Sequence, residues 1–182
     1  MSTRPLSPQD LSSEGQAAYQ ARNFLEAAAA FEQAARAYRA SGDEVAAAEA
    51  ANNSSVAYLQ AGDAQKAFEM AENTHLVFAG QGDLTRQGMA LANQAAALEG
   101  LNRLKEALEL YRQSSEVFKS SGDHELRAMV LQNISALQLR TGEQLQALAT
   151  MDTALEQKKR LSLKEKFLKR LLKIPFEMLN RK

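Results

Sequence analysis

The chain has 182 residues, 45% of them hydrophobic, with 22 basic and 22 acidic side chains, which is typical of a globular domain and excludes a disordered chain. It contains no cysteine, which excludes disulfide bonds and thiolate metal sites. The N-terminal residues have no apolar run typical of a signal peptide, and no stretch approaches the roughly 18 apolar residues of a membrane span. We therefore expect a cytoplasmic protein.

The zero net charge hides an uneven distribution along the chain. Residues 1–156 carry 12 Lys/Arg and 20 Asp/Glu, whereas residues 157–182 carry 10 Lys/Arg and 2 Asp/Glu. An acidic body followed by a basic tail indicates that the two parts have different roles or partners.

Proline and glycine divide the chain at regular intervals. No proline lies between residues 9 and 174, and this stretch is rich in Ala, Leu, Gln and Glu, which favours uninterrupted helices. Gly-Asp pairs recur at a constant interval, at 42–43, 82–83 and 122–123. Further stop signals lie about halfway between these pairs: Gly62-Asp63, Gly100 (two residues early) and Gly142-Glu143. Because glycine can end a helix and aspartate can cap the next, a helix should stop at each of these signals.

This punctuation predicts helices and repeats in a simple order. We expect helices at 8–21, 24–40, 44–60, 64–79, 84–99, 103–119, 124–140 and 144–159, and a tail helix at 161–174 that Pro175 ends. The corresponding domains are a flexible N-terminus (1–7), a solenoid (8–159) and a basic tail (160–182). The repeats within the solenoid are expected at 8–40, 41–80, 81–120 and 121–159.

Aligning the chain on its Gly-Asp pairs also brings side chains of one kind to equivalent positions. Small residues at a repeated position allow neighbouring helix backbones to approach closely, and large residues fill the space between layers. The small series is Ala27, Ala67, Ala107 and Ala147, and the aromatic series is Tyr38, Phe78 and Phe118.

Residues 93–111 resemble the tetratricopeptide repeat (TPR) pattern, in which Leu98, Asn102, Leu104, Ala107 and Tyr111 occupy the core positions. The neighbouring repeats match at fewer positions: Asn53, Tyr58, Gly62 and Ala67; Asn133, Ile134, Gly142 and Ala147; and, more divergently, Gly15, Phe24, Ala27, Phe31 and Ala34. The repeat length is similar to that of the long-repeat subclass that includes kinesin light chains and spindle-orientation adaptors. The resemblance implies an all-α, right-handed superhelical solenoid of four helix–turn–helix repeats, with a C-terminal amphipathic helix.

The usual Leu-Gly pair of the TPR pattern is missing from this chain. Its positions hold Ser54-Ser55, Gln94-Ala95 and Ile134-Ser135. The contact between the two helices of a repeat should therefore be built from other small residues.

The resemblance implies a protein–protein adaptor, not an enzyme, that binds a peptide in the concave groove lined by the first helix of each repeat. The only histidines, His75 and His124, lie in different repeats, so we expect no catalytic group, metal site or cofactor.

An asparagine series is the strongest candidate binding site. An amide can both donate to and accept from a peptide backbone, and in long-repeat TPR adaptors this asparagine typically faces the groove. The alternative is that these amides bridge neighbouring helices of the solenoid. Together with positions sharing the same wall, the candidate set is Asn52, Asn53, Val56, Arg86, Met89, Asn93, Arg127, Met129, Gln132 and Asn133. The two methionines have core packing as their alternative role.

The basic tail forms a second candidate surface. Over residues 158–174, the apolar side chains fall on one half of a helical wheel and the cations on the other. Such a helix can cap the last repeat. It can also make the chain a structural or assembly subunit tethered to an anionic membrane or a larger complex. The candidate residues are Lys166, Phe167, Lys169, Arg170, Leu171 and Lys173. No nucleic-acid partner is expected, because the body is acidic. The sequence leaves the oligomeric state open.

Overall fold

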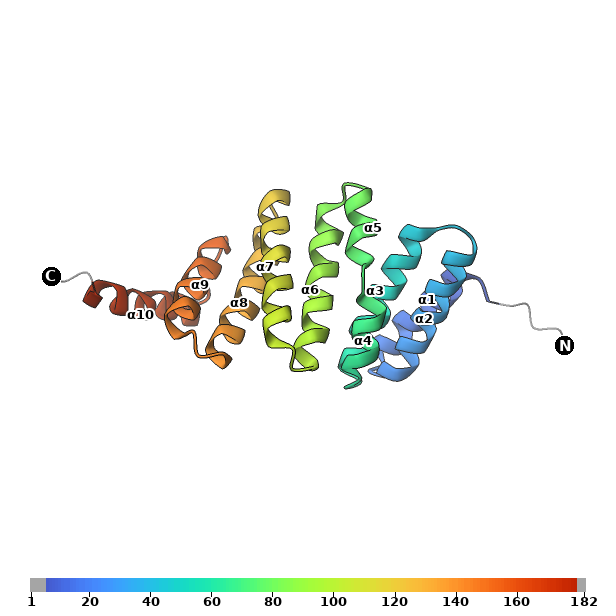
Figure 1. Ribbon diagram of the computed structural model, residues 1–182, viewed down its shortest axis with the longest axis horizontal. Coiled ribbons are helices and arrows are strands. Elements are labelled where there is room, and N and C mark those ends of the chain that lie inside the picture. The colour runs from blue at the N-terminus through green and yellow to red at the C-terminus, as the bar shows by residue number, and fades with distance from the viewer. Residues whose placement is uncertain (1–5, 180–182) are drawn as a thin grey trace. The chain divides into compact units, whose positions relative to one another are not determined.

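The computed structural model describes residues 6–179, and side chains for residues 6–172. Residues 1–5 of the predicted N-terminal segment, residues 180–182 of the tail and the side chain of Lys173 therefore lie outside the described part. All regular elements from residue 6 to residue 179 are helices, which confirms the all-α repeat fold (Figure 1). They are α1 (Pro8–Gln20), α2 (Phe24–Ala40), α3 (Glu44–Gln60), α4 (Ala64–Ala71), α5 (Thr74–Gly80), α6 (Leu84–Gly100), α7 (Leu104–Ser121), α8 (His124–Arg140), α9 (Gln144–Gln157) and α10 (Leu163–Leu179).

The helices belong to two compact units, residues 1–110 and 111–182, whose boundary falls within α7. In the first unit α1 packs on α2, α2 on α3 and α3 on α4, while α6 packs on α3, α4 and α5. In the second unit α8 packs on α9, and α9 on α10. The domain and repeat limits inferred from the sequence stay predictions.

One turn geometry joins all successive helices except the pairs α4–α5 and α9–α10. Its positive-φ residues recur at even intervals, at Arg22, Gly42, Gly62, Gly82, Asn102, Gly122 and Gly142. In the turn after α2, the Asp43 N–H donates to the carbonyl of Tyr38 at 3.0 Å. The Asp43 carboxylate then accepts from the Ala46 N–H at 3.0 Å. The same aspartate thus closes one helix and caps the next.

The helix ends at Gly100 as predicted, but Gly100 itself does not adopt the left-handed conformation that we expected of it. The left-handed residue is Asn102, with φ of 59°, because asparagine tolerates this conformation better than most residues. Gly100 is instead the last residue of α6. A Cβ on Gly100 would lie 2.8 Å from the Cβ of Ala64, so a close approach of helices explains the glycine.

The prediction of one continuous helix at 64–79 is wrong, because this segment is interrupted between α4 and α5. Glu72 leaves the helical conformation with ψ of 127°, and Asn73 adopts a left-handed φ of 60°. The Thr74 hydroxyl donates to the carbonyl of Ala71 at 2.8 Å. This bond satisfies a carbonyl group that the interruption leaves without its helical partner.

The tail helix begins and ends later than predicted. Ser162 and Glu165 form a reciprocal capping box, with the Ser162 N–H 2.8 Å from Glu165 Oε2 and the Glu165 N–H 3.3 Å from Ser162 Oγ. Accordingly, α9 ends at Gln157 and α10 starts at Leu163. Pro175 does not end α10, which continues to Leu179. Proline removes one backbone donor, but its ring fixes φ within the helical range.

The repeated alanines pack as predicted. Ala27, Ala67 and Ala107 are fully buried, and Ala147 is 1% exposed. In the second repeat, the Ser54 hydroxyl donates to the carbonyl of Ala28 at 2.9 Å, and that of Ser55 to the carbonyl of Ala67 at 2.7 Å. The serines that replace the usual Leu-Gly pair therefore tie α3 to α2 and to α4.

Candidate peptide-binding site

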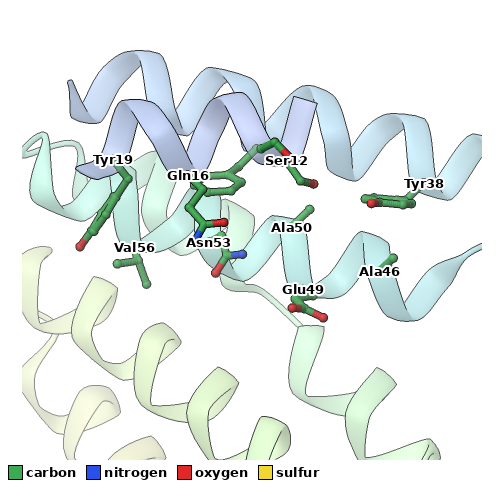
Figure 2. A pocket seen from close by; sticks show the side chains of 11 residues that line it. Ser12, Gln16, Tyr19, Tyr38, Ala46, Glu49, Ala50, Asn53 and Val56 are labelled. Atoms are coloured by element: carbon green, nitrogen blue, oxygen red, sulfur yellow. The ribbon is translucent and has the colours of Figure 1, made fainter. Parts of the chain in front are cut away.

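A groove of about 540 Å³ lies between α1, α2 and α3 of the first unit (Figure 2). Pockets of this size are typical of sites that hold a small ligand or a short peptide segment. The lining residues are Ser12, Ser13, Gln16 and Tyr19 of α1, Phe31 and Tyr38 of α2, and Ala46, Glu49, Ala50, Asn53 and Val56 of α3.

Helical periodicity explains why these residues share the groove. The α3 positions recur at intervals of three and four residues, which places them on one face of the helix. Ala46 and Ala50 carry only a methyl group, so α3 leaves open space beside α1. At one end of the groove, Tyr19 packs edge-on against Phe24, with ring centroids 5.4 Å apart and planes at 62°.

Two amide side chains line opposite walls of this groove. Asn53 on α3 is exposed, and within residues 6–172 its side chain has no hydrogen-bond partner. Figure 2 shows Gln16 extending from α1 toward α3, where Asn53 lies. Each amide presents both a donor and an acceptor, so the pair can bind the backbone of a peptide lying between them.

The electrostatics at the Glu49 edge of the groove involve Arg86. The Arg86 guanidinium lies 2.7 Å from Asp83 Oδ2 and 3.3 Å from Glu49 Oε2, and it stacks over the Phe78 ring with its centre 5.1 Å from the ring centroid. Hydrogen bonds from the backbone and side chain of Arg86 lower the pKa of Asp83. The predicted contact of Arg86 with an acidic ligand would therefore compete with two carboxylates already in place.

Asn52 and Asn93 form a bridge between helices. Asn52 is buried, and its Nδ2 donates to the carbonyl of Ala48 at 3.1 Å. Its Oδ1 accepts from Asn93 Nδ2 at 3.3 Å, which joins α3 to α6. This geometry favours the bridging role for Asn93, whereas Asn53 has the exposure that a groove contact requires.

The remaining candidates of the asparagine series divide between the two units. Met89 of the first unit is 46% exposed and Met129 of the second is 59% exposed, so neither is a core residue. Also in the second unit, Asn133 is exposed and Gln132 half-buried. Arg127 Nη1 donates to Gln157 Oε1 at 3.2 Å. All these binding assignments stay predictions.

Sequence reasoning missed the α1 side of the groove. Ser13 lies one repeat length before Asn53, and Gln16 lies one repeat length before Val56, so the same alignment that gave the asparagine series could have placed them. The signal was weak because serine and glutamine replace the residue types found in the later repeats. Tyr19 is a further α1 residue that lines the groove.

The histidines do not form a site. Burial lowers the pKa of His75, and His124 Nδ1 lies 3.1 Å from Gln157 Oε1. Across the described part of the chain, no group of three or more His, Cys, Asp or Glu side chains has a geometry suited to a metal ion. Within the same residues, no helix is both long and apolar enough to cross a membrane.

The tail candidates lie together on α10. Lys166, Lys169 and Arg170 surround a shallow hollow of about 260 Å³ next to Leu161. Phe167 and Leu171 are 64% and 43% exposed. The backbone of Lys173 continues the same helix.

Comparison with known proteins gives the repeat its name. Residues 86–160 match the family described as tetratricopeptide repeat, and no curated protein sequence matches the chain.

Among solved structures, the apo form of RapI is similar over 95% of this chain, with a TM-score of 0.74 and 20% identity. The chain spans 50% of the RapI chain. A Podosopora anserina structure described as "kinesin light chain nearly identical TPR-like repeats" is similar with a TM-score of 0.53 and 15% identity, and each chain is covered completely. A substituted form of the same repeats gives a TM-score of 0.54 at 15% identity, over 98% of this chain and 100% of the other. These similarities show an all-α repeat fold, and the match to the tetratricopeptide repeat family extends over residues 86–160.

Proposed function

We propose that the chain is a protein-binding adaptor that holds an extended peptide segment of its partner in the groove between α1 and α3. The observation that supports this function is the pair of amides, Gln16 and Asn53, on opposite walls of an open groove. The family matched over residues 86–160 is one of repeats, which is consistent with a binding role.

The groove favours recognition of backbone over recognition of one particular side chain. An extended peptide presents N–H and C=O groups on both edges, and two amides on facing walls can pair with both. Ala46 and Ala50 line the groove with methyl groups only, which leaves room for peptide side chains of different size. Tyr19 and Tyr38 add aromatic surface, which is common at protein interfaces.

Panning a displayed peptide library against the full-length chain tests this proposal. Peptides that are enriched should bind the unmodified protein in a calorimetric titration. Asn53→Ala should weaken binding by about 1–3 kcal/mol, because it leaves a peptide group unsatisfied in a partly desolvated groove. Ala46→Leu should weaken binding as well, because the larger leucine side chain occupies space inside the groove.

A matched amide outside the groove provides the control. Gln33 is exposed on α2 and does not line the groove, so Gln33→Ala should leave peptide affinity unchanged. Melting temperatures of all three variants separate loss of binding from loss of folding. If both the Asn53→Ala and the Ala46→Leu variant bind every enriched peptide as tightly as the unmodified protein does, this groove is not the binding site.

A further inference from the structure

The exposed side of α10 carries an apolar stripe. Leu163, Phe167 and Leu171 are 85%, 64% and 43% exposed. They follow one another at intervals of four residues, and at about 100° per residue each is displaced by only about 40° from the last. A contiguous stripe of this kind, on a helix that already packs on its neighbour, indicates a surface that meets something else.

The stripe is not the part of α10 that packs on its own unit. Leu172 is 5% exposed, and it lies about 180° around the helix from Leu163. Because α10 packs on α9, one edge of its apolar arc is already covered. The other edge is the stripe.

Two ion pairs hold α10 against the end of α9 and the residue that follows it. The Lys158 ammonium lies 2.6 Å from Glu165 Oε1, and this hydrogen bond, together with those from Ser162, lowers the pKa of Glu165 to about 2. Farther along, Lys169 Nζ lies 4.0 Å from Glu156 Oε1. The stripe is therefore presented on an anchored helix.

Cations flank the stripe on both sides. Lys166 and Arg170 lie along one side, and Lys164 lies along the other. Among residues 6–172, neither Lys166 nor Arg170 has an acidic partner within 4.0 Å. These two cations, with Lys169, surround the hollow beside Leu161, whose volume is about 260 Å³. Three cations around a shallow hollow suit a phosphate group at a surface.

We propose that α10 lies in the plane of an anionic lipid surface, with Leu163, Phe167 and Leu171 at the acyl boundary and Lys166 and Arg170 on headgroup phosphates. An apolar face bordered by lysine and arginine is the pattern of a helix that binds in the plane of an interface. A second copy of the chain fits less well, because it would bring its own cations against those of the first. This inference is independent of the groove between α1 and α3.

The natural sequence contains no tryptophan, so one substitution creates a specific reporter. The emission of Phe167→Trp in the full-length protein should shift to the blue on phosphatidylserine-containing vesicles and not on pure phosphatidylcholine vesicles. Leu76→Trp is the matched control, because Leu76 is 58% exposed on α5, and its emission should not change. Added salt should reverse the shift, since the cations act through a screened potential.

Flotation of the otherwise unmodified protein measures how much the stripe and the cations contribute. Phe167→Ser combined with Leu171→Ser should lower the vesicle-bound fraction about tenfold. Leu76→Ser combined with Leu145→Ser removes two side chains of similar exposure elsewhere and should leave it unchanged. Lys166→Gln with Arg170→Gln should weaken binding and reduce its salt dependence, whereas Lys105→Gln with Arg112→Gln should do neither.

Three outcomes would overturn the proposal. The first is absence of flotation with phosphatidylserine vesicles at low salt. The second is flotation that the Phe167→Ser, Leu171→Ser variant retains. The third is that the unmodified protein does not float but forms a dimer in sedimentation velocity, and that the Phe167→Ser, Leu171→Ser variant does not form this dimer. That result would assign the stripe to a second copy of the chain. Inorganic phosphate, added at an ionic strength too low to screen membrane binding, should not release the protein from the vesicles. Release under this condition would instead assign the hollow beside Leu161 to free phosphate.

Discussion

The Ser135 hydroxyl donates a 2.8 Å hydrogen bond to the backbone carbonyl of Ala147, joining α8 to α9. It repeats the 2.7 Å bond between Ser55 and Ala67 that joins α3 to α4. Serine at this position thus replaces the glycine of the usual TPR pair by a side chain that still permits close packing and adds a bond between helices. Ala95 occupies the same position in the third repeat, where no hydroxyl is available.

Ser135→Ala should lower the free energy of unfolding by about 1 kcal/mol, because it removes a buried hydrogen bond while the Ala147 carbonyl keeps its helical partner. Urea denaturation measures this change. The control is Ser120→Ala, which removes a hydroxyl that bonds to its own helix at an exposed position. If the two variants unfold with equal stability, the bond between the helices contributes nothing measurable.

Gly100→Ala and Gly80→Ala should have different effects, although each glycine is the last residue of its helix. A Cβ on Gly100 meets Ala64 at 2.8 Å, whereas a Cβ on Gly80 meets nothing within 4 Å. The first substitution should cost about 1–3 kcal/mol through overpacking. The second should be neutral or stabilising by up to about 1 kcal/mol, because alanine restricts the unfolded chain. Thermal unfolding of both variants checks this, and equal melting temperatures would contradict the close approach at Gly100.

Arg22→Gly should stabilise the first turn. Arg22 has φ of 64° where the later turns mostly use glycine, and a side chain in this conformation costs about 1 kcal/mol or more. The reverse change, Gly122→Ala, should destabilise by a similar amount, since Gly122 has φ of 78°. Urea denaturation of both variants should give changes of opposite sign. A loss of stability in Arg22→Gly would mean that its contact with the Phe24 ring, at 6.0 Å, outweighs the strain.

Stability should fall in alkaline solution because of Tyr58. Burial, and then the 2.7 Å hydrogen bond to Glu32, raise the pKa of Tyr58 to about 12, whereas an unfolded tyrosine titrates near about 10. The folded state therefore holds the phenolic proton more tightly. The raised pKa of Tyr58 contributes up to about 2 kcal/mol to the free energy of unfolding. This contribution is complete below about pH 10 and is lost as the pH rises through about 12.

Tyr58→Phe isolates this contribution from the titration of lysines in the same range. The unfolding free energy of the Phe variant should fall less steeply between about pH 10 and about pH 12 than that of the natural chain. Parallel pH profiles for the two proteins would contradict the raised pKa.

The turns and the buried alanines could be predicted because each depends on a local requirement. A left-handed residue and a capping aspartate are visible in the sequence, and small residues at a fixed spacing mark close packing. The interruption at Glu72 and Asn73 could not be read in the same way, because no glycine or proline marks it. Gly100 misled for a related reason: glycine serves both for a left-handed turn and for close packing, and only the position of Ala64 distinguishes the two.

The candidate groove was predictable in register but not in detail. Spacing placed Asn53 and Val56 on one face of α3, and both side chains line the groove. An asparagine can face a groove or form a hydrogen bond with a side chain of the adjacent helix, and its rotamer and the residues of that helix decide between the two. Asn93 forms such a hydrogen bond with Asn52. The α1 wall depends on residues that differ from those at the equivalent positions of later repeats.

The aspartate that serves two helices at once has a consequence for how such a chain can change in length. In the turn at Gly42 and Asp43, a single residue is both the closing position of α2 and the cap of α3, so the turn contains no spare residue. One inserted residue would either break this double bonding or start the next helix about 100° out of phase, turning its alanine face toward water. Growth or loss by whole modules avoids this penalty, so chains of this kind should vary in steps of a complete helix pair and tolerate single-residue insertions poorly at these corners.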